Sequence, residues 1–187
     1  MMTRRWFSQM ACVTIAFAAL CVSGVATATS IVARTVPELT ALSSLVVEAS
    51  IGEQRSWIES DGPIYTETAL TVHRYLKGQG PVQLSVTQRG GVVGDVRDVI
   101  PGDMTLQPGT RVVIFLQEKD GRRWSTLLGW SVFEVLGEGP ASAVRRNADH
   151  LGLYRPSADG YRPVNPEQLS GPQTMADLVR AVTGVNP

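Results

Sequence analysis

The run Arg-Val-Val-Ile-Phe-Leu at residues 111–116 constrains the fold of this 187-residue chain more than any other stretch. It is rich in β-branched and aromatic side chains and places apolar residues on both alternating faces of a strand. A strand that is apolar on both faces has to be covered on both. The run therefore predicts the central strand of a barrel or sandwich.

The first 28 residues predict a secretory signal peptide. Arg4 and Arg5 give a basic start, residues 10–22 form an apolar stretch, and the triplet Ala-Thr-Ala ending at Ala28 matches a cleavage site. Since the apolar stretch is shorter than the roughly 20 residues that cross a bilayer, we expect cleavage after Ala28 and no membrane span afterwards. The arginine pair also resembles a bacterial twin-arginine signal, but we expect the general secretory route and a periplasmic or extracellular location.

The composition narrows the classes of partner and chemistry. Both cysteines, Cys12 and Cys21, lie within the predicted signal peptide, so the remaining chain would hold no disulfide, thiol nucleophile or cysteine metal site. Cleavage would leave 15 basic against 17 acidic residues, with no long run of like charge. This balance argues against nucleic acid and against an anionic membrane surface as partners. Roughly 160 residues would remain, which suits one domain.

Alternating apolar and polar side chains predict strands on both sides of the central run. The expected strands cover residues 45–51, 64–76, 82–87, 124–128 and 131–136, with short edge strands at 143–147 and 161–164. Glycines between the second and third strands predict an antiparallel hairpin, and Asp120-Gly121 predicts another turn. Residues 52–63 are polar and predict a loop that carries Trp57.

Two capping patterns predict short helices. Thr35, with a glutamate three residues later, predicts a helix through about Leu42, with Leu39 and Leu42 on one apolar face. A second pattern of this kind begins at Thr174 and predicts a C-terminal helix that ends at Gly184.

Together these elements predict a mainly β fold, a small antiparallel barrel of five or six strands with a short N-terminal and a C-terminal helix. A β-sandwich is the competing architecture. We expect the barrel over residues 29–137. A C-terminal extension over residues 138–187 is expected to pack on it with edge strands and a helix.

The order of these segments resembles the netrin-like and TIMP-like OB-fold modules. The similarity rests on Ser-Leu-Val-Val-Glu-Ala at 44–49, Tyr-Leu-Lys-Gly at 75–78 and the Pro-Gly-Thr triplet at 108–110 that leads into the central run. Exported bacterial proteins with the same layout are also similar over residues 44–136. The resemblance implies an OB-like barrel that binds something. The metalloprotease-inhibiting mechanism is not implied, because the expected first residue is Thr29 rather than a disulfide-bonded cysteine.

A glycine-rich connection at residues 89–110 is the expected binding segment. Glycine allows positive φ and close approach of the backbone to a ligand, so we select Gly90, Gly91, Asp95 and Asp98 as candidate binding residues. No lysine and no helix pattern follow these glycines, which argues against a phosphate-binding loop. We expect a wide loop that crosses one end of the barrel.

The sequence holds no recognisable catalytic or metal constellation, and we expect no cofactor. Asp95, Asp98 and Asp103 would suit calcium by residue type, but their spacing matches no known calcium loop. The two histidines, His73 and His150, are distant in sequence, and neither has the companions of a triad or a zinc site.

Two further groups of residues leave alternatives open. Paired carboxylates for glycoside hydrolysis would have to come from strand glutamates: Glu48, Glu67 and Glu134. Aromatic side chains suit a glycan or peptide surface, and the candidates are Trp57, Tyr65, Trp124 and Trp130. We expect at least two of these four in the core.

These observations predict an exported, non-enzymatic binding module. Its expected partner is an extracellular or envelope protein, and regulation of a protease is one form that this role would take. An exported hydrolase with a site built from Asp or Glu is the alternative, as is a structural envelope protein.

Overall fold

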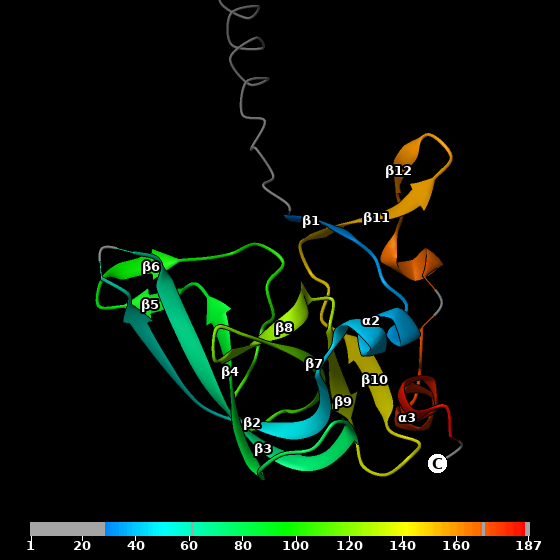
Figure 1. Cartoon of the computed structure of the whole chain (residues 1–187), viewed down its shortest axis with the longest axis horizontal. Helices are drawn as coiled ribbons and strands as arrows, with labels where there is room; N and C mark the ends of the chain where they lie inside the picture. Colours follow the sequence, from blue (N-terminus) through cyan, green and yellow to red (C-terminus); the bar gives the residue numbers. More distant parts are fainter. Residues whose placement is uncertain (1–28, 61, 170, 186–187) are drawn as a thin grey trace, which may run out of the picture.

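The computed structural model describes residues 29–60, 62–169 and 171–185, so the predicted signal peptide lies outside the described residues. The described chain is mainly β, as predicted, with an N-terminal and a C-terminal helix (Figure 1). The strands are β1 (Thr29–Val32), β2 (Leu45–Ile58), β3 (Ile64–Lys77), β4 (Gln83–Arg89), β5 (Gly91–Val93), β6 (Val96–Asp98), β7 (Arg111–Lys119), β8 (Arg122–Gly129), β9 (Val132–Leu136), β10 (Ala143–Arg146), β11 (Leu151–Ser157) and β12 (Gly160–Pro163). The helices are α2 (Val36–Leu42) and α3 (Met175–Thr183), and a short 3-10 turn, η1, covers Pro166–Gln168.

The main sheet has the strand order β10-β9-β7-β2-β3-β4-β8, and an additional pairing joins β7 to β8. Five strands, β2, β3, β4, β8 and β7, therefore form a ring of hydrogen bonds. Neighbours in the ring run antiparallel except β4 and β8, which meet in parallel where Thr87 lies opposite Trp124. The strands β5 and β6 form a separate hairpin, and β1, β11 and β12 form a third sheet.

The central strand, β7, is covered on both faces, as its apolar run predicts. Residues 112–116 are all buried. Val113 and Phe115 belong to one core, which they share with both helices, and the ring centroids of Phe115 and Phe133 lie 6.1 Å apart there. The alternate residues of the run belong to a second core, which they share with β2, β3 and β4.

Both helices begin at the predicted caps. The Thr35 backbone N–H donates to the Glu38 carboxylate at 2.7 Å, and the Glu38 N–H donates to the Thr35 hydroxyl at 3.4 Å. The Asp177 N–H donates to the Thr174 hydroxyl at 3.2 Å. Gly184 adopts the left-handed conformation that ends α3.

The apolar face expected for the first helix is only half correct. Leu39 is fully buried, whereas Leu42 is 57% exposed. Leu42 is the last residue of α2 and does not belong to the core that Leu39 joins.

The polar segment at residues 52–63, expected as a loop, is instead mostly strand. The strand β2 continues through Ile58 and pairs with β3, with a register shift between Ile51 and Gln54. Near this shift Gly52 lies against β3, where a Cβ would be 3.3 Å from the Ala69 Cβ. The prediction was wrong because this half of β2 is largely exposed and lacks apolar alternation. Pairing with β3 makes it a strand.

Four strands have no counterpart in the sequence prediction: β1, β5, β6 and β11. The connection at residues 89–110 contains the β5–β6 hairpin rather than only a wide loop. The strands β1 and β11 pair in parallel, with Thr29 opposite Leu151. These partners are distant in sequence, so no local pattern reveals them.

The two ends of the molecule differ in character. Figure 1 shows the β5–β6 hairpin at one end, both helices at the other, and the long curved strands β2 and β3 running from one toward the other. Among the described residues, none of the helices has the length and apolar character that crossing a membrane requires.

Candidate functional site

A cleft of about 430 Å³ lies where the β5–β6 hairpin meets β2, β3 and β4. Its volume is within the roughly 300–1,000 Å³ that ligand pockets occupy. The backbone of the glycine-rich connection and apolar side chains from residues 99–106 form part of its wall. Polar side chains that line it include Gln54, Ser56, Thr66, Gln88, Asp98 and Asp103.

Two adjacent glycines allow the hairpin to lie against the sheet. A Cβ at Gly91 would be 2.3 Å from the Thr66 hydroxyl oxygen and 2.6 Å from that of Ser56, and one at Gly90 would be 2.8 Å from the Asp98 carbonyl oxygen. Both glycines have positive φ, 88° at Gly90 and 140° at Gly91. The Thr66 hydroxyl donates to the Gly90 carbonyl at 2.7 Å. The geometry of this wall therefore requires glycine at both positions.

Three of the four binding residues selected from the sequence line this cleft: Gly90, Gly91 and Asp98. The fourth, Asp95, is exposed in the turn between β5 and β6. Among the described residues, no group of three or more His, Cys, Asp or Glu side chains is arranged to hold a metal ion. The structure thus brings most of the selected segment together as a cleft rather than as a calcium loop.

Asp103 is the most perturbed titratable group of the cleft, and sequence reasoning considered it only as a calcium ligand. Burial raises the pKa of its carboxyl to about 6, and a hydrogen bond from the Met104 N–H at 2.7 Å partly offsets this effect. A carboxyl that titrates near neutral pH inside a cleft is a feature of functional sites. Its burial depends on how residues 99–106 fold over the sheet, which no local sequence pattern reveals.

Gln88 presents a buried acceptor to the same cleft. Its Nε2 donates to the Met104 carbonyl at 3.2 Å, whereas its Oε1 is buried and accepts from no group among the described residues. A buried acceptor without a partner costs about 1–3 kcal/mol.

Exposed apolar side chains adjoin the cleft on the hairpin side. Val92 is 57% exposed, Val96 55% and Val99 59%, and Val92 and Val99 line the cleft itself. The charged side chains that line the cleft are of both signs, because Arg89 and Arg97 accompany the two aspartates. The site is therefore a mixed apolar and polar surface without a strong excess of one charge.

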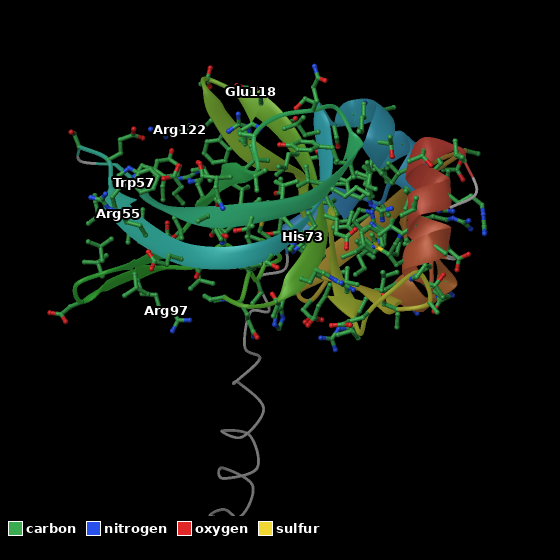
Figure 2. All side chains as sticks on the ribbon, turned by 90° about the horizontal axis from the view of Figure 1, so that it is seen from below. Arg55, Trp57, His73, Arg97, Glu118 and Arg122 are labelled. Atoms are coloured by element: carbon green, nitrogen blue, oxygen red, sulfur yellow. The ribbon has the colours of Figure 1, made fainter. Side chains whose placement is uncertain are left out.

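The aromatic side chains weighed as a binding surface separate into two groups. Trp57, Tyr65 and Trp124 gather on the sheet, with ring centroids 5.8 Å apart for Trp57 and Tyr65 and 5.9 Å apart for Tyr65 and Trp124. The Arg122 guanidinium lies over this group, 5.4 Å from the Tyr65 centroid, and Figure 2 shows it close to Trp57. Arg122 also pairs with Glu59 at 2.8 Å. The three rings therefore contact one another and Arg122. Trp130 is buried in the core that includes both helices.

The histidines do not form a catalytic group. The Nε2 of His73 is hydrogen-bonded to the Ser50 hydroxyl at 2.7 Å on the exposed surface of the long strands (Figure 2). No acidic side chain among the described residues hydrogen-bonds this ring to complete a triad. His150 lies in a turn with a φ of 62°. Sequence reasoning missed the Ser50–His73 contact because it depends on the register of β2 and β3.

The three strand glutamates weighed as paired carboxylates do not converge. Glu48 and Glu134 line different hollows, and each pairs with an arginine. Glu67 accepts a hydrogen bond from the Ser85 hydroxyl at 2.8 Å. None of them lines the cleft beside the hairpin.

Comparisons of the chain with protein-family models, curated proteins and solved structures find no match. A fold by itself does not specify an activity.

The raised pKa of Asp103 predicts a pH dependence of stability. Its pKa is 3.8 in the absence of the fold and about 6 within it, so the folded chain binds this proton more tightly than the unfolded chain. The free energy of unfolding should therefore fall as pH rises through this window, by up to about 3 kcal/mol from this group.

Urea denaturation of the parent and of Asp103→Asn at a series of pH values measures this effect. The stability of the variant relative to the parent should grow between about pH 4 and pH 7, because the amide does not ionise. A relative stability that stays constant across that range would show that Asp103 titrates normally.

Proposed function

We propose that this chain is an exported, non-enzymatic module that binds another protein through the β5–β6 hairpin and the cleft beside it. The observation that carries the proposal is the combination of exposed valines with a polar cleft in one region. Val92, Val96 and Val99 are each more than half exposed. Exposed apolar side chains gathered beside polar ones are typical of protein interfaces.

The chemistry of the cleft suits an extended polypeptide segment. The side chains of Gln54, Ser56 and Thr66 line the cleft and are of types that hydrogen-bond to a peptide backbone. The two aspartates and the two arginines offer partners for side chains of either sign. A polyanion such as nucleic acid would instead need a concentrated basic surface.

We also propose that the five-stranded ring is an OB-like barrel of the netrin-like or TIMP-like kind. The number of strands in the ring and its parallel pairing between β4 and β8 support this assignment. The hairpin lies in the connection between β4 and β7, the third and fourth ring strands along the chain. OB folds bind ligands on the face of strands 2 and 3 and on the loops 1–2 and 4–5, so the OB assignment does not itself select the hairpin. The assignment concerns architecture and does not identify the partner.

The test replaces Val92 and Val96 together by asparagine. The immobilised chain is exposed to envelope and secreted fractions of the source organism, and each retained protein is identified by mass spectrometry. We expect a retained protein whose affinity falls at least about tenfold in this variant, because apolar contacts at the centre of an interface carry most of its free energy.

Val82→Asn is the matched control, since Val82 is 64% exposed and precedes β4 at the turn after β3. It should retain the same protein as the parent. Equal retention by both variants, or no retained protein that depends on the hairpin, would contradict the proposal. Thermal unfolding of each variant shows whether the fold is kept.

A hydrolase is the second candidate function, and Asp103 is the observation that favours it. Its carboxyl has a pKa of about 6 and shares the cleft with Asp98. A carboxyl of this kind can donate or accept a proton near neutral pH. The cleft would have to position a scissile bond and a water molecule between these groups.

Chromogenic esters, glycosides and peptides test this candidate. The hydrolase reading predicts turnover with an inflection in the pH–rate profile near pH 6, and Asp103→Asn should remove both the inflection and most of the activity. Asp95→Asn is the control, because Asp95 lies outside the cleft. Turnover that Asp103→Asn leaves unchanged would refute a role for this carboxyl.

A further inference from the structure

A second hollow, of about 320 Å³, lies among the segment that begins α2, the strand β11 and the helix α3. Figure 1 places these elements at the end of the molecule away from the β5–β6 hairpin. Three arginines line the hollow: Arg34, Arg146 and Arg155. One carboxylate, that of Asp177, lines it as well.

Arg146 is a half-buried cation that stacks on two aromatic rings and forms no ion pair with any carboxylate of the described residues. Its guanidinium carbon lies 3.9 Å from the ring centroid of Trp130 and 4.2 Å from that of Phe133, and its Nη1 donates to the Trp130 carbonyl. Burial lowers its pKa to about 9. Stacking fixes the plane of the guanidinium, which pre-organises its N–H groups for a planar anion.

Arg155 and Arg34 add positive charge that is weakly compensated. Arg155 forms no ion pair with any residue that the structure describes. It lies opposite Arg162 in the β11–β12 ladder, and like charges in opposite positions destabilise a ladder. Arg34 contacts Glu38 at 3.5 Å, in a pair whose side chains are both well exposed.

The carboxylate of Asp177 does not neutralise these arginines. The Thr174 hydroxyl donates to it at 2.7 Å and the Arg180 guanidinium at 3.1 Å. The Thr174 hydrogen bond is the main cause that lowers the pKa of Asp177. Its charge is thus already engaged at the start of α3, and the hollow keeps an excess of positive charge.

Apart from Thr35, the remaining lining of the hollow is apolar. It includes the indole of Trp130 and the side chains of Leu169, Pro172 and Ala181. The volume is at the lower end of the range for small-molecule pockets, roughly 300–1,000 Å³. An occupant would therefore be small, with an anionic end and an apolar end.

We propose that this hollow binds a small carboxylate that carries an apolar group. The carboxylate would lie between Arg146 and Arg155 and accept paired hydrogen bonds from the guanidinium groups. The apolar group would pack against Trp130 and the side chains from α3 and the segment before it. The site is separate from the hairpin, so a test of this proposal does not depend on the proposed protein-binding function.

Isothermal titration calorimetry of the full chain with phenylacetate tests the proposal, with phenylacetamide and inorganic phosphate as comparison ligands. Phenylacetate should bind, the neutral amide should bind at least about tenfold more weakly, and phosphate should be weaker than phenylacetate because it has no apolar group. Equal binding of acid and amide would overturn the anion site. Equal binding of phosphate and phenylacetate would overturn its apolar half.

Two arginine variants separate the site from a general charge effect. Arg155→Gln should weaken phenylacetate binding about tenfold or more, through loss of a charge-assisted hydrogen bond. Arg55→Gln is the matched control, because Arg55 is an exposed strand residue outside this hollow. Equal losses in the two variants, or no loss in Arg155→Gln, would contradict the assignment.

The Trp130 indole N–H gives a reporter of position. It donates to the Arg34 carbonyl at 2.9 Å, and its NMR resonance should shift on addition of phenylacetate. The indole N–H of Trp124, which donates to the Lys119 carbonyl, should not shift. A shift of Trp124 without one of Trp130 would place the ligand elsewhere and refute the site.

Discussion

Burial of β7 on both faces is the constraint on which the rest of the structure depends. Residues 112–116 leave no polar face, so each side of the strand needs a separate cover. On one side, β2, β3 and β4 complete a core with the strand. On the other side, α2, α3 and β9 complete a second core around Phe115. Removal of either cover would expose half of an apolar strand to water.

This arrangement explains why the two candidate sites lie at opposite ends of the molecule. The ring strands β2 and β3 extend beyond the cores, and the hairpin packs on their far end through two glycines, Gly90 and Gly91. The helices cover the other face of β7. The hollow with three arginines lies among the start of α2, the strand β11 and the helix α3. The cleft is therefore formed by ring strands together with the hairpin, whereas the hollow is formed by elements outside the ring.

Local patterns in the sequence predicted the central strand, both helix caps and the hairpin of β3 and β4, because each depends on residues close together in the chain. They failed where a partner decides the structure. The polar half of β2 is a strand because β3 pairs with it, and β11 is a strand because β1 does. The sequence predicted no cleft, although three of the residues selected from it, Gly90, Gly91 and Asp98, line the one that the structure contains. The sequence did not predict the environments of Gln88 and Asp103, because these arise from long-range packing.

Amide hydrogen exchange measured by NMR tests the central claim most directly. If the two covers of β7 hold the fold together, the amides of residues 112–116 and of their β2 partners should exchange most slowly, only through global unfolding. The amides of the β5–β6 hairpin should exchange faster, because the hairpin lies at the end of the ring, outside both cores. Exchange in residues 112–116 as fast as in the hairpin would contradict the account, since β7 would then open without unfolding the rest.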